Sequence, residues 1–319
     1  MMVETLEKKL ALDRHAELIL QKALGAAPVR IEKISAGVMT VKFAAELPAG
    51  RRYVVRFYPP NRCETVRYEP DILRRCRDVG LPVPNVICDS RSGPEAPLQY
   101  MVYAMVDGVP LSQKYSTLTG ESRAETARTI VTWLETLKQI QVAGYGDLAD
   151  ATTALYSSWQ DFLHESFSQG IESARRHKLL DPKTIDSLQA IATQIQNAQL
   201  ETPGVLTWGD ITAENIIIND DNRPVGLLDF EGALAGDYLL NLGYCLARFH
   251  QNPFFESLVR AWPIEPAGPQ WFRIKLYAIL RAMRIVKFAH QPLPTGHPRM
   301  PVEKLLPGFT WALDNILQT

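Results

Sequence analysis

The sequence lacks the features of several protein classes. No apolar run in its 319 residues approaches the ~18 residues that a membrane-spanning helix needs. Lys and Arg number 34 and Asp and Glu 35, so the net charge of −1 provides no overall positive surface for nucleic acid. The opening MMVETLEKKLALDRH is charged throughout and has no apolar segment typical of a secretory signal. We therefore expect a cytoplasmic protein that binds neither a membrane nor nucleic acid.

Cysteine is also scarce, and no two cysteines form a C-x-x-C pair. The four are Cys63, Cys76, Cys88 and Cys245. This number and spacing excludes a disulfide framework and a thiolate zinc site, and favours buried, unreactive side chains. The chain has no internal repeat or low-complexity tract, and 46% of it is hydrophobic. That is enough for one large domain or two closely packed ones.

Residue periodicity predicts a change of character near residue 107. The first part predicts a leading helix over 3–24, five strands over 29–34, 38–47, 52–58, 86–88 and 98–105, and a helix over 61–79. The second part predicts helices over 121–141, 158–178, 181–199, 239–249 and 270–290, with short strands over 205–230. The chain is thus predicted to be α+β, with a small β-rich lobe at 1–107 and a larger, mainly helical lobe at 108–319.

The residues that carry chemistry lie between 205 and 233. Asp210 follows an apolar strand, Asn215 opens the run Ile216–Ile218, and Asp229 follows the return strand of a hairpin. This arrangement can bring two carboxylates and an amide oxygen to one edge. Such a set of hard oxygen donors suits Mg²⁺, which completes its shell with water and substrate phosphates.

These residues carry a family resemblance. Asp-x4-Asn, a strand and then Asp-Phe-Glu-Gly-Ala resemble the Brenner-type motif of the aminoglycoside phosphotransferase and choline kinase superfamily. The resemblance implies a protein-kinase-like fold, with an antiparallel N-terminal lobe holding one inserted helix and a helical C-terminal lobe. It implies that Asp210 is catalytic and that Asn215 and Asp229 bind Mg²⁺. The reaction implied is direct transfer of phosphate from ATP or GTP to the hydroxyl of a small acceptor, which is an antibiotic or a metabolite.

The same resemblance extends to the N-terminal lobe. Ser35, Ala36 and Gly37 stand where the family has its phosphate-covering loop, and Arg56 stands on the strand that carries the nucleotide-binding cation. Glu69 is the candidate partner of Arg56, although Pro70 must begin or kink that helix. The backbone of the hinge would contact adenine, at Tyr103, Ala104, Met105 and Val106.

Two further matches concern the C-terminal lobe. Gly144-Tyr-Gly146 with Ser158–Leu163 is most similar to the hygromycin-B-phosphotransferase-like branch. Gly236-Asp237 resembles the family's Gly-Asp-Pro stretch, but Asn241 stands where that pattern is more often acidic.

Leu239 also departs from that pattern, since a polar or acidic residue is more usual there. A third departure is Trp208, which stands where the family usually has a loop-holding His. A nucleotide-binding pseudokinase that acts as a scaffold or sensor is therefore an alternative. A protein kinase is a second alternative, but no Ala-Pro-Glu stretch follows Asp229.

The charges of one predicted helix indicate the kind of acceptor. Residues 271–290 carry five basic residues, Arg273, Lys275, Arg281, Arg284 and Lys287, and no acidic residue. A polycation would meet like charge there, so we expect an acceptor that is neutral, singly charged or anionic. Glu231 could contact metal or substrate, or pair locally. The sequence does not indicate an oligomeric state.

Overall fold

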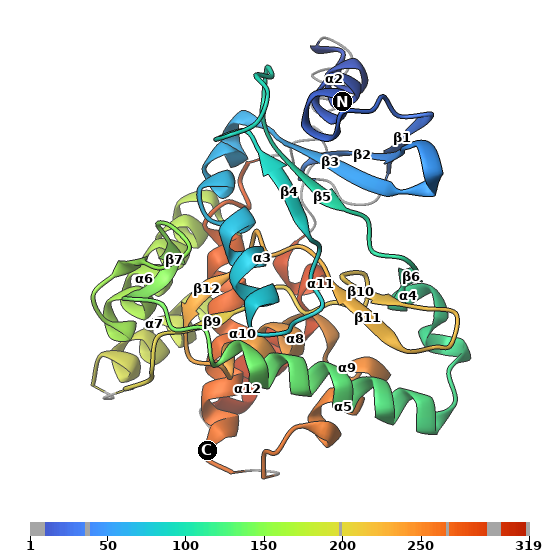
Figure 1. Cartoon of the computed structure of the whole chain (residues 1–319). Coiled ribbons are helices and arrows are strands. Elements are labelled where there is room, and N and C mark those ends of the chain that lie inside the picture. Colours follow the sequence, from blue (N-terminus) through green and yellow to red (C-terminus); the bar gives the residue numbers. More distant parts are fainter. Residues whose placement is uncertain (1–9, 36–38, 198–199, 266–267, 292–300, 317–319) are drawn as a thin grey trace. The chain divides into compact units, whose positions relative to one another are not determined.

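The computed structural model describes residues 10–35, 39–197, 200–265, 268–291 and 301–316. The chain divides into two compact units. The first contains the described residues up to Asp107 together with Gly226–Glu231. The second contains Gly108–Val225, Gly232–Gln291 and the described residues after position 300. Figure 1 shows the elements of both units.

The first unit is built on a five-stranded sheet of order β1-β2-β3-β5-β4, all of whose neighbours run antiparallel (Figure 1). Its strands are β1 (Arg30–Ile34), β2 (Val41–Glu46), β3 (Arg52–Tyr58), β4 (Val86–Asp89) and β5 (Gln99–Ala104). Alternation sends Val41, Phe43 and Ala45 to one face, where they form a core with Ile19 and Leu20 of helix α2 (Leu12–Leu24). The residues between them, including Lys42, are thereby left to the opposite face.

The helix predicted over 3–24 is interrupted at Ala11. α2 begins at Leu12 because Ala11 takes a left-handed conformation, with φ +45°, which a continuous helix does not allow. Residues 3–9 of the predicted helix lie outside the described residues.

The helix predicted over 61–79 is divided. A 3₁₀ segment, η2 (Pro60–Arg67), precedes helix α3 (Glu69–Asp78). Pro70 stands in the first turn of α3, where a missing N–H costs nothing, so it begins the helix and does not kink it. Glu69 is consequently placed at the start of α3, where it is buried.

The second unit is mainly helical. Its helices are α4 (Leu111–Lys114), α5 (Gly120–Leu137), α6 (Trp159–His177), α7 (Pro182–Asn197), α8 (Leu240–Phe249), α9 (Pro253–Ala261), α10 (Gln270–Val286), α11 (Val302–Leu305) and α12 (Pro307–Ile316). Helix α10 packs against α6, α8 and α12. Close approach needs glycine at two of these crossings, because a Cβ at Gly170 would meet Met283 and one at Gly243 would meet Tyr277.

Short strands complete the second unit. A four-stranded sheet has the order β8-β7-β12-β9, with β7 (Tyr145–Leu148), β8 (Ala154–Tyr156), β9 (Val205–Thr207) and β12 (Leu234–Gly236). A second sheet has the order β11-β10-β6, with β6 (Val109–Pro110), β10 (Ile216–Ile218) and β11 (Pro224–Leu227). The sequence prediction missed α9 and α12, each of which begins at a proline. No helix in the described part of the chain is both long enough and apolar enough to cross a bilayer.

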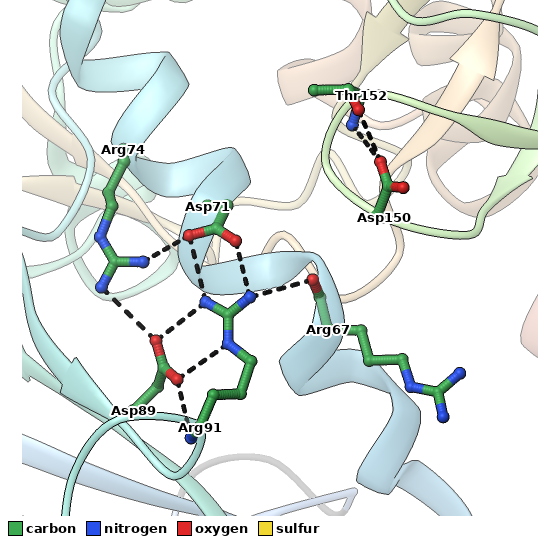
Figure 2. A network of polar contacts seen from close by, with 7 residues as sticks. All are labelled: Arg67, Asp71, Arg74, Asp89, Arg91, Asp150 and Thr152. Carbon is green, nitrogen blue, oxygen red and sulfur yellow. Dashed lines mark hydrogen bonds and ion pairs between the residues drawn. The ribbon is translucent and has the colours of Figure 1, made fainter.

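An ion-pair network ties α3 to the end of β4 and the residues after it. Figure 2 shows the Arg91 guanidinium between Asp71 and Asp89, with Arg74 joining both carboxylates. Arg91 also donates to the backbone carbonyl of Arg67, whose own side chain points away in Figure 2. Hydrogen bonds from Arg91 lower the pKa of Asp71. Burial raises the pKa of Asp89, but Arg91 outweighs it and lowers that pKa as well.

Arg91→Met should lower the free energy of unfolding by about 1 kcal/mol, since buried Asp89 loses its main partner while half-exposed Asp71 contributes little. Both carboxyls have pKa values below the ordinary Asp range, so this stabilisation is complete above about pH 4 and is lost as the pH falls further. Chemical unfolding at neutral and acidic pH measures the difference between variant and wild type. Arg67→Met is the matched control and should change nothing, and a difference that persists undiminished at about pH 2 would contradict this assignment.

Candidate functional site

The loop after β9 presents Asp210 through a tight backbone turn. Trp208 is fully buried, and Gly209 takes φ +76°. A Cβ at Gly209 would collide with the backbone carbonyl of Gly232. The loop can pass this point only with glycine in the left-handed region, and that turn sends Asp210 outward while its neighbour stays in the core.

Asn241 holds this loop from the start of α8. Its side-chain oxygen accepts hydrogen bonds from the backbone N–H of Trp208, at 3.0 Å, and of Gly209, at 3.4 Å. An amide oxygen can fill this acceptor role as a carboxylate oxygen would. Asn241, where the family pattern is more often acidic, therefore still accepts hydrogen bonds from the backbone N–H groups of this loop. It does so although Trp208 stands in place of the usual His.

Asp210 and Asn215 are in direct contact. The Asn215 amide nitrogen donates to the Asp210 carboxylate at 2.9 Å and to the Asp210 backbone carbonyl at 3.2 Å. Thr212 accepts the Asn215 backbone N–H through its backbone and side-chain oxygens. With its NH₂ group committed to Asp210, Asn215 leaves its amide oxygen as the group available to a cation.

The second oxygen of Asp210 faces a small cavity within the second unit. Arg281 of α10 donates to it at 3.2 Å, and the Arg281 guanidinium lies 4.9 Å from the centre of the Tyr244 ring. The cavity holds about 120 Å³ and is lined by Asp210, Ile211, Tyr244, Arg248, Arg281, Ile285, Leu305 and Leu306. The Tyr244 hydroxyl is buried and has no hydrogen-bond partner among the described residues.

A second cluster of charges lies in the first unit, around Arg56. This guanidinium is only 3% exposed, and its Nη1 donates to Glu69 at 2.9 Å. Its Nη2 donates to Asp229 at 3.0 Å and to Glu231 at 2.6 Å. Its Nε donates to the Thr40 hydroxyl at 3.1 Å. We call these residues, Thr40, Arg56, Glu69, Asp229 and Glu231, the Arg56 cluster.

Glu69 links α3 to the segment that carries Asp229. Besides Arg56, it accepts from the Tyr58 hydroxyl at 2.7 Å and from the backbone N–H of Phe230 at 3.1 Å. Burial raises the pKa of Glu69 to about 7, against the opposing effect of Arg56. The Arg56–Glu69 pair, which Pro70 had left open, is therefore present and buried.

Asp229 is held in a strained conformation. Its φ of +62° lies in the left-handed region, which a non-glycine residue rarely adopts. Burial raises its pKa, but the charges of Arg56 and Lys42 outweigh burial and hold that pKa below the ordinary Asp value. An ionised carboxylate kept in a strained turn is the kind of feature that gathers at functional sites.

The other residues predicted for the nucleotide are partly described. Ser35 ends the described segment after β1, while Ala36 and Gly37 lie outside the described residues. In the hinge, the Ala104 N–H donates to Asn85 and the Met105 N–H donates to Arg52, so neither is free to bind a base. Tyr103 pairs with Val54 within the sheet. Of the four predicted hinge residues, Val106 is thus the best placed to offer a backbone N–H.

The basic residues of α10 are paired, which removes the reason for expecting this helix to repel a polycationic acceptor. Arg273 pairs with Asp237, Arg281 with Asp210 and Arg284 with Asp147, and Lys275 donates to the backbone carbonyl of Asn315. These partners come from distant parts of the sequence, so the helix is not the basic surface that its own residues indicate. Reading charge from one helix alone missed this neutralisation.

A family model described as "Phosphotransferase enzyme family" matches residues 30–277, most of the chain. The chain belongs to the phosphotransferase enzyme family. This confirms the resemblance read from the Asp210, Asn215 and Asp229 motifs. A comparison with curated protein sequences found no match.

Solved structures of this family share the fold. The thermostable mutant of aminoglycoside phosphotransferase APH(4)-Ia with AMP-PNP and hygromycin B has a TM-score of 0.69 at 16% identity, covering 95% of this chain and 96% of its own. The streptomycin–ATP complex of APH(2″)-IIa has a TM-score of 0.66 at 17% identity, covering 96% of each chain. These matches confirm the predicted two-lobed, protein-kinase-like fold. The expectation that the acceptor is not a polycation gains no support, since the neighbours include complexes with aminoglycosides.

Asn241→Leu should lower the free energy of unfolding by about 2 kcal/mol, because two buried N–H groups lose their acceptor. Asn241→Asp keeps an acceptor at the same place and should lose less than about half of that amount. Urea unfolding of the two variants measures both. Equal losses in both variants would show that the Asn241 oxygen does not hold the loop of this family member.

Proposed function

We propose that the protein is a small-molecule kinase that transfers the γ-phosphate of ATP or GTP directly to a hydroxyl of its acceptor. The observation that carries this proposal is the bond between Asn215 and Asp210 in a member of the phosphotransferase family. Phosphoryl transfer depends mainly on positioning and charge stabilisation, and a carboxylate locked by a neighbouring amide supplies the positioning.

Asp210 is the proposed catalytic residue. One carboxylate oxygen is held by Asn215, and the other faces the cavity beside Arg281. In that cavity an acceptor hydroxyl would donate to the second oxygen of Asp210, which orients the hydroxyl and takes its proton as the new bond forms. Part of the Arg281 contact must give way, and its 3.2 Å length makes it the weaker of the two restraints on Asp210.

Asn215 and Asp229 are the residues that would hold Mg²⁺. They offer an amide oxygen and an ionised carboxylate, both hard donors that suit this ion. Among the described residues, no three His, Cys, Asp or Glu side chains form a metal site by themselves, so nucleotide phosphates and water would have to complete the shell. Bound Mg²⁺ would supply neutralisation of the charge that develops on the phosphates.

The nucleotide is assigned to residues 1–107 and the acceptor to residues 108–319. Ser35, Ala36 and Gly37 are proposed to cover the phosphates and Val106 to contact the base, while Arg56 and Glu69 border the site. AMP-PNP, ADP and ATP in the similar structures support a nucleotide co-substrate. The aminoglycosides bound by some of these neighbours make such antibiotics the first acceptors to test.

Asp210→Asn should lower kcat by about 100-fold or more while leaving nucleotide affinity within about threefold, because it removes the proton acceptor and keeps the side chain's shape. Release of nucleoside diphosphate, measured with Mg²⁺ across a panel of hydroxylated compounds, gives the rates. Asp220→Asn is the control, since that carboxylate is fully exposed on the hairpin between β10 and β11.

Two results would count against the proposal. Turnover that survives in Asp210→Asn at near wild-type rates would remove the assigned catalytic residue. Nucleotide binding without turnover on any acceptor would favour the scaffold or sensor alternative.

A further inference from the structure

Lys42 lies beside Arg56 on the same face of the sheet. The two residues are direct partners in the antiparallel pair of β2 and β3. Directly opposed residues of antiparallel strands send their side chains to the same face, within about 5.5 Å at Cβ. Val41 and Phe43, on either side of Lys42, point instead into the core beneath α2. Lys42 therefore shares the face that carries the Arg56 cluster.

Arg56 already makes several hydrogen bonds where it lies. A guanidinium has five N–H donors, and four hydrogen bonds join Arg56 to Thr40, Glu69, Asp229 and Glu231. Moving it to a phosphate would take the cation from Glu69, which is 1% exposed, and from the partly buried Asp229 and Glu231, and leaving a buried carboxylate unpaired is costly. Arg56 is thus better suited to hold this cluster together than to follow a phosphate.

Lys42 has no such engagement. Its ammonium makes no hydrogen bond or ion pair with any residue that the structure describes, although its charge interacts with those of Asp229, Glu231 and Glu69. Its flexible four-carbon stem and rotatable donors suit a point contact with a phosphate that arrives and leaves. Asp229, whose charge acts on Lys42, is the residue proposed to hold Mg²⁺.

We propose that Lys42, one strand away from the position that the family resemblance assigns, makes the direct cationic contact with the nucleotide phosphates, while Arg56 positions Glu69, Asp229 and Glu231. This inference rests on the proposed function, because it names the phosphate-binding residue of the same site. The sequence analysis missed Lys42, since only the register of β2 against β3 sets it beside Arg56.

The test compares ATP with adenosine, which lacks phosphates, by calorimetric titration of the full chain with Mg²⁺. Lys42→Met should raise the Kd for ATP by about tenfold or more, leave the Kd for adenosine within about twofold, and preserve the melting temperature of the free protein. Lys42→Arg should recover part of the ATP affinity. Lys22→Met is the matched control, because that exposed lysine lies on α2, across the sheet from Lys42.

The outcomes separate the two proposals. If wild type does not bind ATP, the proposed function fails and takes this inference with it. If wild type binds ATP and Lys42→Met retains the same ratio of ATP to adenosine affinity, Lys42 is not the phosphate contact. The ratio is measured within one variant, so a general loss of folded protein does not imitate the expected result.

Discussion

The first unit depends on a single buried cation. Arg56 gathers Glu69 from the start of α3 and Asp229 and Glu231 from a segment more than 170 residues later in the chain. A buried guanidinium is stable only with its charge matched and its donors used, and each of its carboxylate partners needs the guanidinium in turn. This mutual requirement explains why Gly226–Glu231 belongs to the first unit although its chain neighbours on both sides belong to the second.

The loop around Asp210 also depends on a few residues, which allow its tight turn and accept hydrogen bonds from its backbone. Glycine at 209 allows the left-handed turn against Gly232, and Asn241 satisfies the backbone of Trp208. Trp208 itself fills the core and is fully buried. The loop therefore keeps an acceptor for its N–H groups at Asn241, and the core accommodates the Trp208 ring.

Together, the two centres divide the work of the proposed reaction. The charges around Asp229 hold its pKa below the ordinary Asp value, which suits the Mg²⁺-binding role proposed for it. Asn215 and Arg281 fix the two oxygens of Asp210, one firmly and one loosely, at the edge of the small cavity. We propose that Lys42 supplies the phosphate contact. Its ammonium makes no hydrogen bond or ion pair with a described residue, so it is available to a phosphate that binds and leaves.

The sequence predicted Asp210 and Asn215, whose spacing is local, and the resemblance added the Arg56–Glu69 pair, but Lys42 was missed because only tertiary structure brings it beside Arg56. Asp210 and Asn215 are five residues apart on one loop, so their meeting followed from the motif. Lys42 is fourteen residues from Arg56, and its role depends on strand register, which alternation of apolar residues does not define.

The wrong inference about α10 has the same origin. The acids that neutralise Arg281 and Arg284 lie 71 and 137 residues away, beyond the reach of any pattern within the helix. Helix α12 was missed because its first residues, Pro307 and Gly308, resemble a loop. Gly308 is in fact required there by the close approach of the Leu246 carbonyl.

The most direct test of the central claim is a double-mutant cycle at Arg56 and Glu69, with Arg56→Met, Glu69→Gln and the double variant unfolded in urea. If Arg56 organises this cluster, Arg56→Met leaves the buried Glu69 without its cation, whereas Glu69→Gln removes one of three carboxylate partners of Arg56. The coupling free energy between the two positions should then be about 2 kcal/mol. Additive losses, with a coupling below about 0.5 kcal/mol, would contradict the account, because Arg56 and Glu69 would then act independently.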